Sequence, residues 1–159
     1  MSSVLRSAKK TNNSRSISVF PLHLGGSNGS KVELDAIFTP PYNAAKYGIT
    51  FTSSPRQADV ILLLGAATPK ALGPALDLLQ SLPDSVKLVL LGSDATSGAP
   101  FAETYATLGP LIPAPEGVGE EDLPGNALPP GKYIASYVAG SPPDPQVIIN
   151  AILAAANKE

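Results

Sequence analysis

The run Val60-Ile61-Leu62-Leu63-Leu64 constrains the fold more than any other segment, because every position in it is apolar. A strand with one face in water alternates apolar and polar side chains, whereas a strand buried on both faces is apolar throughout. Burial on both faces is typical of a parallel sheet that has helices on either side. The sequence therefore predicts a central strand of such a sheet at residues 58–64.

The segments around this run alternate between strand and helix patterns. Leu72, Leu76 and Leu79 recur at the spacing of one helical face, which predicts an amphipathic helix at 69–82. The same reading predicts further strands at 17–24, 49–52, 86–91 and 133–138, and further helical segments at 31–38, 43–47 and 143–157. Strands that alternate with helices indicate an α/β fold, here an open parallel sheet with helices on both faces.

Residues 93–130 break this alternation. They are rich in proline and carry the acidic run Glu120-Glu121-Asp122, so we expect an irregular segment. A loop of this length in a compact domain usually serves a function or covers a partner.

The amino-terminal residues 1–16 differ from the rest of the chain in charge. We predict a basic tail here, flexible or docking, followed by a single α/β domain at 17–159. No acid precedes Glu33, and the tail holds four of the 11 basic residues: Arg6, Lys9, Lys10 and Arg15. Three interpretations of the tail stay open: a disordered end, an organellar targeting peptide and a docking segment. Docking is favoured over targeting.

Composition excludes several classes of function. Outside the tail, 7 basic residues stand against 13 acidic ones, and no basic patch with interleaved aromatics predicts a nucleic-acid partner. The chain has no cysteine, which excludes disulfides, thiolate catalysis and cysteine-ligated metal sites. Its longest apolar run, residues 60–67, is too short to cross a bilayer, and we expect no signal peptide.

Three polar loops follow predicted strands, and they bring together the candidate site residues. Ligands of open α/β sheets bind in the crevice outside the carboxyl ends of the strands, so loops far apart in sequence can meet there. The loops are Gly26-Ser27-Asn28-Gly29-Ser30, the segment 92–98 and Gly140-Ser141-Pro142-Pro143. We therefore expect these three loops to share one pocket.

These loops resemble the cluster-binding motifs G-S-C-N-G-C, G-x-C-A-x-S-G-G and G-C-P-P. The motifs belong to the proximal-cluster subunit of complex I (20 kDa, PSST type) and to the small subunit of energy-converting [NiFe] hydrogenases. The resemblance covers roughly residues 15–157. Residues 54–60 are similar to S-P-R-[HQ]-A-D-[VL], and residues 39–43 to T-P-R-Y-D. The resemblance implies a flavodoxin-like fold.

The resemblance also implies a [4Fe–4S] cluster held by four cysteine thiolates. The four matching positions carry Ser27, Ser30, Asp94 and Ser141 instead. Hydroxyl and carboxylate oxygens are hard ligands, whereas iron–sulfur clusters need soft thiolates. We therefore predict a divergent member of the family without the cluster. One carboxylate among hydroxyls also predicts no Mg²⁺ or Ca²⁺ site.

The leading hypothesis for the function follows from a retained fold and lost ligands. It is a structural or assembly subunit of a membrane-associated complex related to energy-converting hydrogenase or complex I, not catalytic alone. The resemblance implies packing against a large-subunit homologue, with the basic tail on a membrane-arm subunit. The protein would lie peripherally on the cytoplasmic face of the membrane, or alternatively be soluble in the cytoplasm.

Three more residues are candidate contacts. Glu33 falls at an acidic position of the family pattern, and Tyr42 lies in the T-P-R-Y-D match. The resemblance puts Arg56 near the pocket or the partner, although a helix-capping or ion-pairing role, with Asp59 nearby, is an equal alternative. His23, the single histidine, is interpreted as structural.

A second hypothesis belongs to a different class: a stand-alone protein or enzyme that binds a small anion or nucleotide in the vacated pocket. Backbone N–H groups at a helix start favour anions, and Lys31 adds a positive charge there. The glycine-rich loop has neither Walker spacing nor the G-x-G-x-x-G pattern, so this sequence signal is weak.

Overall fold

A computed structural model describes residues 16–25, 28–98 and 106–157. The described chain forms one sheet of five parallel strands in the order β2-β1-β3-β4-β5. This order is that of flavodoxin-like sheets. The predicted α/β fold with an open parallel sheet is confirmed. The strands are β1 (Ile17–His23), β2 (Ile49–Phe51), β3 (Val60–Leu64), β4 (Lys87–Leu91) and β5 (Ile134–Val138).

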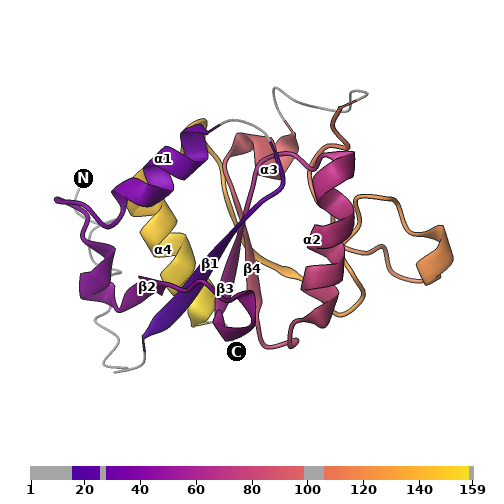
Figure 1. The fold of residues 1–159 in the computed structure, drawn as a ribbon, viewed down its shortest axis with the longest axis horizontal. Helices are drawn as coiled ribbons and strands as arrows, with labels where there is room; N and C mark the ends of the chain where they lie inside the picture. The colour runs from indigo at the N-terminus through magenta and orange to yellow at the C-terminus, as the bar shows by residue number, and fades with distance from the viewer. Residues whose placement is uncertain (1–15, 26–27, 99–105, 158–159) are drawn as a thin grey trace.

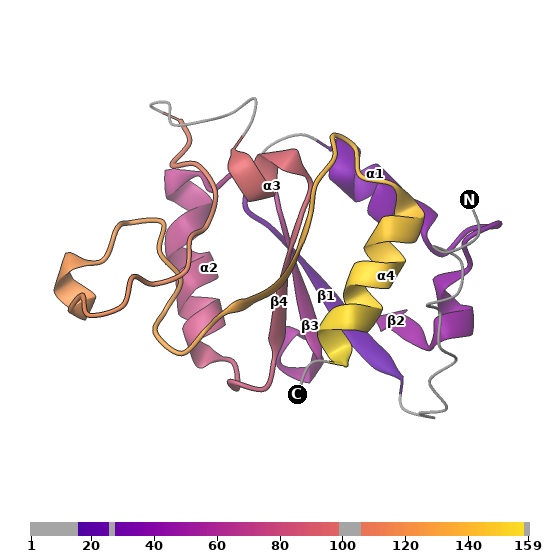
Figure 2. The same ribbon diagram turned by 180° about the vertical axis from the view of Figure 1, so that it is seen from behind.

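Helices cover both faces of the sheet, as Figures 1 and 2 show from opposite sides. One face packs against α1 (Gly29–Ala36) and α4 (Pro145–Ala156), the other against α2 (Pro69–Ser81) and α3 (Ser93–Ser97). Strand β3 serves both cores, because Leu62 lies in the first and Ile61 and Leu63 in the second. All five residues of β3 are buried, which explains why its sequence is apolar throughout.

Strand β1 contains a proline in the middle of the sheet, and hydrogen-bond alternation explains how it fits. The N–H of Leu24 donates to the carbonyl of Leu64 (2.8 Å), whereas the N–H of Ile17 donates toward the β2 side, to Gly48 (2.8 Å). The nitrogen of Pro21 therefore faces the β2 side. Pairing with β2 ends at Val19, so Pro21 lacks an N–H only where no strand needs one.

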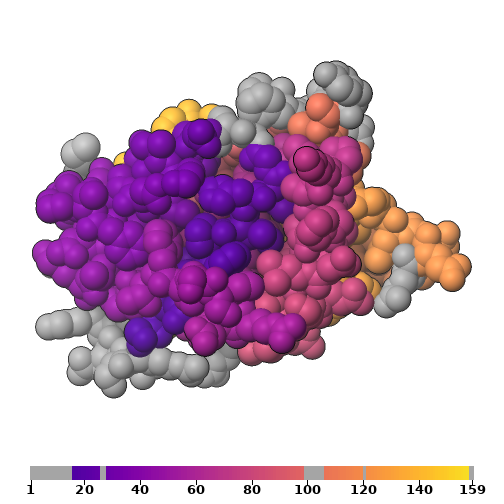
Figure 3. Space-filling model, in the orientation of Figure 1, coloured from indigo at the N-terminus to yellow at the C-terminus, as the bar shows by residue number. Residues whose placement is uncertain are grey.

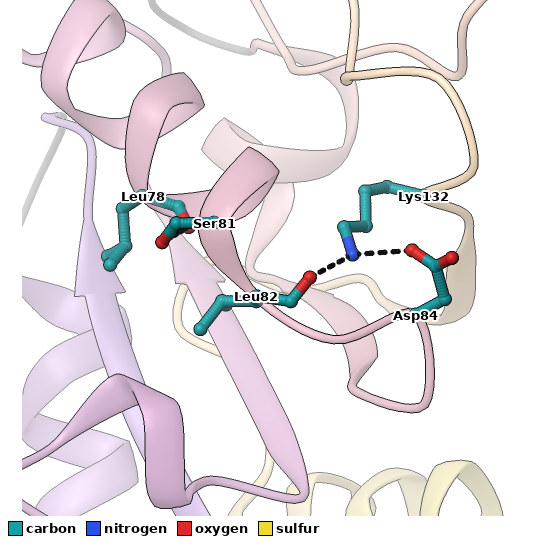
Figure 4. A network of polar contacts seen from close by, with 5 residues as sticks. All are labelled: Leu78, Ser81, Leu82, Asp84 and Lys132. Atoms are coloured by element: carbon teal, nitrogen blue, oxygen red, sulfur yellow. Dashed lines mark hydrogen bonds and ion pairs between the residues drawn. The ribbon is translucent and has the colours of Figure 1, made fainter.

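A buried lysine ties the approach to β5 to the end of α2 (Figure 4). Lys132 Nζ donates to the carbonyl oxygen of Leu82 at 2.6 Å and lies 2.8 Å from Asp84 Oδ1. Leu82 is the residue that ends α2, where carbonyl groups lose their partners within the helix. Lys132 supplies one such partner from 50 residues further along the chain.

The segment predicted to be irregular contains short helical pieces. Residues 93–97 form α3 and Glu120–Asp122 form a 3₁₀ turn, so the prediction was wrong at both places. Each piece is too short to produce a hydrophobic period. Leu111 and Leu128 are buried in the core on the α2 side, and the chain around the 3₁₀ turn projects beyond α2 as the orange lobe of Figure 3.

Most element boundaries differ from the sequence prediction by one or two residues. Helix α1 begins at Gly29, two positions before the predicted residue 31, and β2 ends at Phe51. Two further 3₁₀ turns, Ala44–Tyr47 and Pro55–Gln57, precede β2 and β3. The earlier start of α1 matters for the site, because it places Ser30 in the first turn of the helix.

Candidate functional site

The loops that follow β4 and β5 are joined at the edge of the sheet where the strands end, here called the carboxyl edge. The N–H of Gly92 donates to the carbonyl of Val138, and the N–H of Ser93 donates to the carbonyl of Gly140, both at 2.8 Å. The N–H of Gly140 donates in return to Ser93 Oγ at 3.1 Å. Sequence reasoning missed Ser93, although its place after an apolar strand and a glycine was a usable signal.

The loop after β1 reaches the same place through Ser30. A Cβ atom at Gly92 would overlap Ser30 Oγ and would lie 2.7 Å from Asp94 Oδ1. The two side-chain oxygens therefore lie on the same side of Gly92, whose φ of +92° also favours glycine. We call this contact of Ser30, Gly92 and Asp94 the polar junction. Sequence reasoning did not single out Gly92, the residue that both side chains contact.

Both side chains of the polar junction are buried. Ser30 is 3% exposed and Asp94 is 5% exposed. Asp94 lies in the first turn of α3, where Oδ1 accepts a hydrogen bond of 3.0 Å from the N–H of Ala95. A carboxylate at the start of a helix is stabilised by such N–H groups. Among the described residues, no buried side-chain nitrogen or oxygen lacks a hydrogen-bond partner.

The other two predicted positions, Ser27 and Ser141, are not part of the polar junction that the structure describes. Ser141 is exposed, in the turn between β5 and α4. Ser27 lies outside the described residues. The structure thus brings Ser30 and Asp94 together and leaves Ser141 at the surface of the same edge.

The loop after β3 is packed tightly against the loop after β1. A Cβ at Gly65, whose φ is +85°, would overlap the carbonyl oxygen of Gly25. Thr68 Oγ1 donates to the carbonyl of Leu24 at 3.1 Å and accepts from the N–H of Ala71 at 3.3 Å. Thr68 therefore caps α2 and ties it to the end of β1 at the carboxyl edge.

His23 is the last residue of β1, beside the first turns of α1. Partial desolvation lowers the pKa of His23 below its usual 6.5, the positive charge of Lys31 lowers it further, and Asp35 opposes the shift. Lys31 and Asp35 form an exposed ion pair of 2.7 Å on α1. An exposed pair of this kind contributes little to stability.

The remaining candidate contacts do not join the polar junction. Arg56 is exposed in the turn that precedes β3, so it lies at the amino ends of the strands, opposite Ser30 and Asp94. Tyr42 follows the end of α1 and packs against the core between that helix and α4. Glu33 lies half-buried on α1 itself. Contact of these residues with a partner stays a prediction.

The donor set at the carboxyl edge does not fit a thiolate-held cluster. The chain has no cysteine, and the side chains that meet at Gly92 present a hydroxyl and a carboxylate. Iron–sulfur clusters are held by thiolates, with few exceptions. The described residues also contain no group of three or more histidine, aspartate or glutamate side chains placed to hold a metal ion.

Within the ranges that the structure covers, the helices are all too short or too polar to span a bilayer.

Comparison with known proteins gives the family. The profile of the family described as NADH ubiquinone oxidoreductase, 20 Kd subunit, matches residues 28–155. A probable membrane-bound hydrogenase subunit of Pyrococcus furiosus is 29% identical over 144 residues, which cover 91% of this chain and 76% of that protein. Formate hydrogenlyase subunit 7 of Escherichia coli is 37% identical over 95 residues, 60% of this chain but only 37% of the relative.

A solved structure agrees on the fold. A chain of the membrane-bound sulfane sulfur reductase, an archaeal respiratory membrane complex, superimposes with a TM-score of 0.63 at 22% identity, over 87% of this chain and 67% of that one. The family profile spans both loops of the polar junction and all of the sheet except β1. The chain therefore belongs to the NADH ubiquinone oxidoreductase 20 Kd subunit family.

Proposed function

We propose that this protein is a cluster-less structural subunit of a membrane-associated complex related to energy-converting hydrogenase or complex I. The observation that carries the proposal is the pair Ser30 and Asp94. Both are buried oxygen donors at positions where the family motif has cysteines, in a fold that is otherwise retained. Loss of ligands with retention of fold is what selection for assembly, without selection for electron transfer, would produce.

The names of the relatives support the type of complex. One is a probable membrane-bound hydrogenase subunit and another is formate hydrogenlyase subunit 7. By this similarity, the partner that we propose is a large-subunit homologue. The protein would then be peripheral, on the cytoplasmic face of the membrane. The folded part would be the single domain 17–159, with the basic tail 1–16 on a membrane-arm subunit.

Exposed apolar side chains favour the carboxyl edge as the surface for the large subunit. The three most exposed large hydrophobic residues of the described chain are Val32 (62%), Tyr137 (55%) and Val147 (48%). Val32 and Val147 lie in the first turns of α1 and α4, and Tyr137 is the penultimate residue of β5. All three therefore lie toward the end of the sheet that carries the polar junction, which favours this end over the others as the surface for a partner.

The alternative of a stand-alone ligand-binding protein has less support. It requires a vacated pocket, whereas Ser30 and Asp94 are themselves buried against Gly92. Ligand binding elsewhere on the carboxyl edge would be seen as stabilisation of the isolated chain by anions or nucleotides.

Affinity purification from native membranes tests the proposal. The tagged full chain should bring down a large-subunit homologue together with membrane subunits, identified by mass spectrometry. Val32→Asp should reduce the recovered large subunit about tenfold, because an interface core tolerates a buried charge poorly. Val118→Asp, at an exposed valine (41%) of the lobe around the 3₁₀ turn 120–122, is the matched control and should have no effect.

Recovery of the wild-type chain alone would refute the proposed function. Deletion of residues 2–15 separates the role of the tail. That variant should keep the large subunit and lose the membrane subunits if the tail docks as proposed.

A further inference from the structure

We propose that the polar junction replaces the cluster as the link between the loops at the carboxyl edge, so that the chain folds without iron or sulfide. Contacts between protein atoms would then hold together the loops that a metal cluster would otherwise link. The inference rests on the cluster-less state in the proposed function and on contacts within this chain, but not on the partner proposed there.

The first step of the argument is the origin of the two side chains. Ser30 lies in the first turn of α1, after β1, and Asp94 lies in the first turn of α3, after β4. The helices cover opposite faces of the sheet. Their first turns meet only at the carboxyl edge, where both side chains contact Gly92. The junction therefore joins the two layers of the fold.

The second step is the connection to β5. Ser93, between Gly92 and Asp94, exchanges two hydrogen bonds with Gly140: N–H to carbonyl at 2.8 Å, and Gly140 N–H to Oγ at 3.1 Å. The loops after β1, β4 and β5 thus form one connected set. These are the loops that would carry all four cluster ligands in the family motifs.

The third step is the chemistry of the buried groups. A buried carboxylate or hydroxyl destabilises a fold unless it is hydrogen-bonded. Asp94 Oδ1 accepts from Ala95 N–H, and no buried side-chain polar atom in the described ranges lacks a partner. Asp94 Oδ1 is thus engaged by the protein itself, and Ser30 Oγ is packed against Gly92 rather than facing an open pocket. The geometry is therefore that of a closed structural contact.

The experiment uses the isolated full chain and two measurements. First, the thermal midpoint is measured anaerobically with an iron chelator, and again after incubation with ferrous iron, sulfide and a thiol reductant. We expect midpoints that agree within about 1 °C and no bound iron. Stabilisation by about 5 °C or more together with bound iron and sulfide would overturn the proposal, since only a ligand of the folded state raises the midpoint.

Second, hydrogen exchange is followed at the amides of Gly92, Ser93 and Gly140. Ser30→Ala and Asp94→Ala should each speed this exchange about tenfold, because local opening becomes easier when a buried contact is lost. Ser141→Ala, at the exposed family position, should leave it unchanged. If both junction variants exchange at the wild-type rate, the junction does not link the loops. Ser30→Ala removes a single oxygen, so this arm stays informative even if Asp94→Ala fails to fold.

Discussion

Lys132 Nζ donates a 2.6 Å hydrogen bond to the carbonyl of Leu82, and this bond joins the approach to an edge strand to the end of α2. The Lys132 side chain is 5% exposed, whereas that of Asp84, its ion-pair partner, is 84% exposed. The lysine is therefore held by burial and by the carbonyl more than by the carboxylate.

Lys132→Met should lower the free energy of unfolding by about 1–3 kcal/mol, because the buried stem is kept but the Leu82 carbonyl loses its donor. Asp84→Asn should cost less than about 1 kcal/mol, as expected for one partner of a solvent-exposed charge. Urea denaturation of the two variants measures both. An equal loss in the two would mean that the ion pair, and not the carbonyl bond, holds the lysine.

Gly92→Ala should be strongly destabilising, by about 3 kcal/mol or more. It combines a left-handed φ with overlap of the new methyl group and Ser30 Oγ. Gly117→Ala is the matched control, since Gly117 has a φ of +78° but nothing within 4 Å of its Cβ position. The control should cost about 1–2 kcal/mol from backbone strain alone. The difference between the two, measured by thermal unfolding, reports the crowding at the polar junction together with the backbone strain of Gly92, whose ψ is 159°, and no difference would contradict both.

Thr68→Val should destabilise the protein by about 1–2 kcal/mol. It keeps the shape of the side chain but removes the cap of α2 and the bond to the Leu24 carbonyl. Thr68→Ser keeps the hydroxyl and should lose less than half as much. Denaturant midpoints test this pair, and equal losses would show that the methyl group, not the hydroxyl, matters.

His23 should make stability weakly dependent on pH. Its folded pKa is below 6.5, so as the pH falls through 6.5 the unfolded state binds the proton first. The free energy of unfolding should therefore decrease as the pH is lowered from 6.5 to the folded pKa of His23. Above pH 6.5, this group should make no contribution to the pH dependence. Because His23 is exposed, the loss should stay below about 1 kcal/mol.

Comparison with His23→Gln at pH 7.5 and 5.5 isolates this contribution, since the variant should lack that part of the slope. Removal of the neighbouring charge in Lys31→Met should raise the His23 pKa, as followed by NMR titration. A wild-type His23 that titrates above 6.5 would contradict the assignment.

The sequence was sufficient to predict the strands and the long helices, because their signals are periodic. The uninterrupted apolar run of β3 and the leucine spacing of α2 depend on burial, which the fold imposes on every residue of those elements. The convergence of Ser30 and Asp94 was expected because family motifs placed them in loops that follow the carboxyl ends of parallel strands. The resemblance of three short motifs supplied the family, which the match over residues 28–155 confirmed.

The rest depended on contacts that a linear pattern does not contain. Helix α3 has five residues, mostly polar, and it is fixed by the N–H groups around Asp94 and by the Ser93–Gly140 pair. The bond from Lys132 to Leu82 spans 50 residues and leaves no trace in local composition. The sequence also does not contain the packing of Ser30 Oγ against Gly92, which bears on whether a pocket opens beside Ser30.

Pro21 has a consequence for self-association. Among the described residues, no strand pairs with the β2 side of β1 beyond Val19, and the proline nitrogen faces this side. A strand flank with free N–H groups is a template for addition of another chain, and proline removes one of the donors that such addition needs. Pro21 therefore disfavours the addition of a strand from a second copy of the protein at this unpaired side of β1.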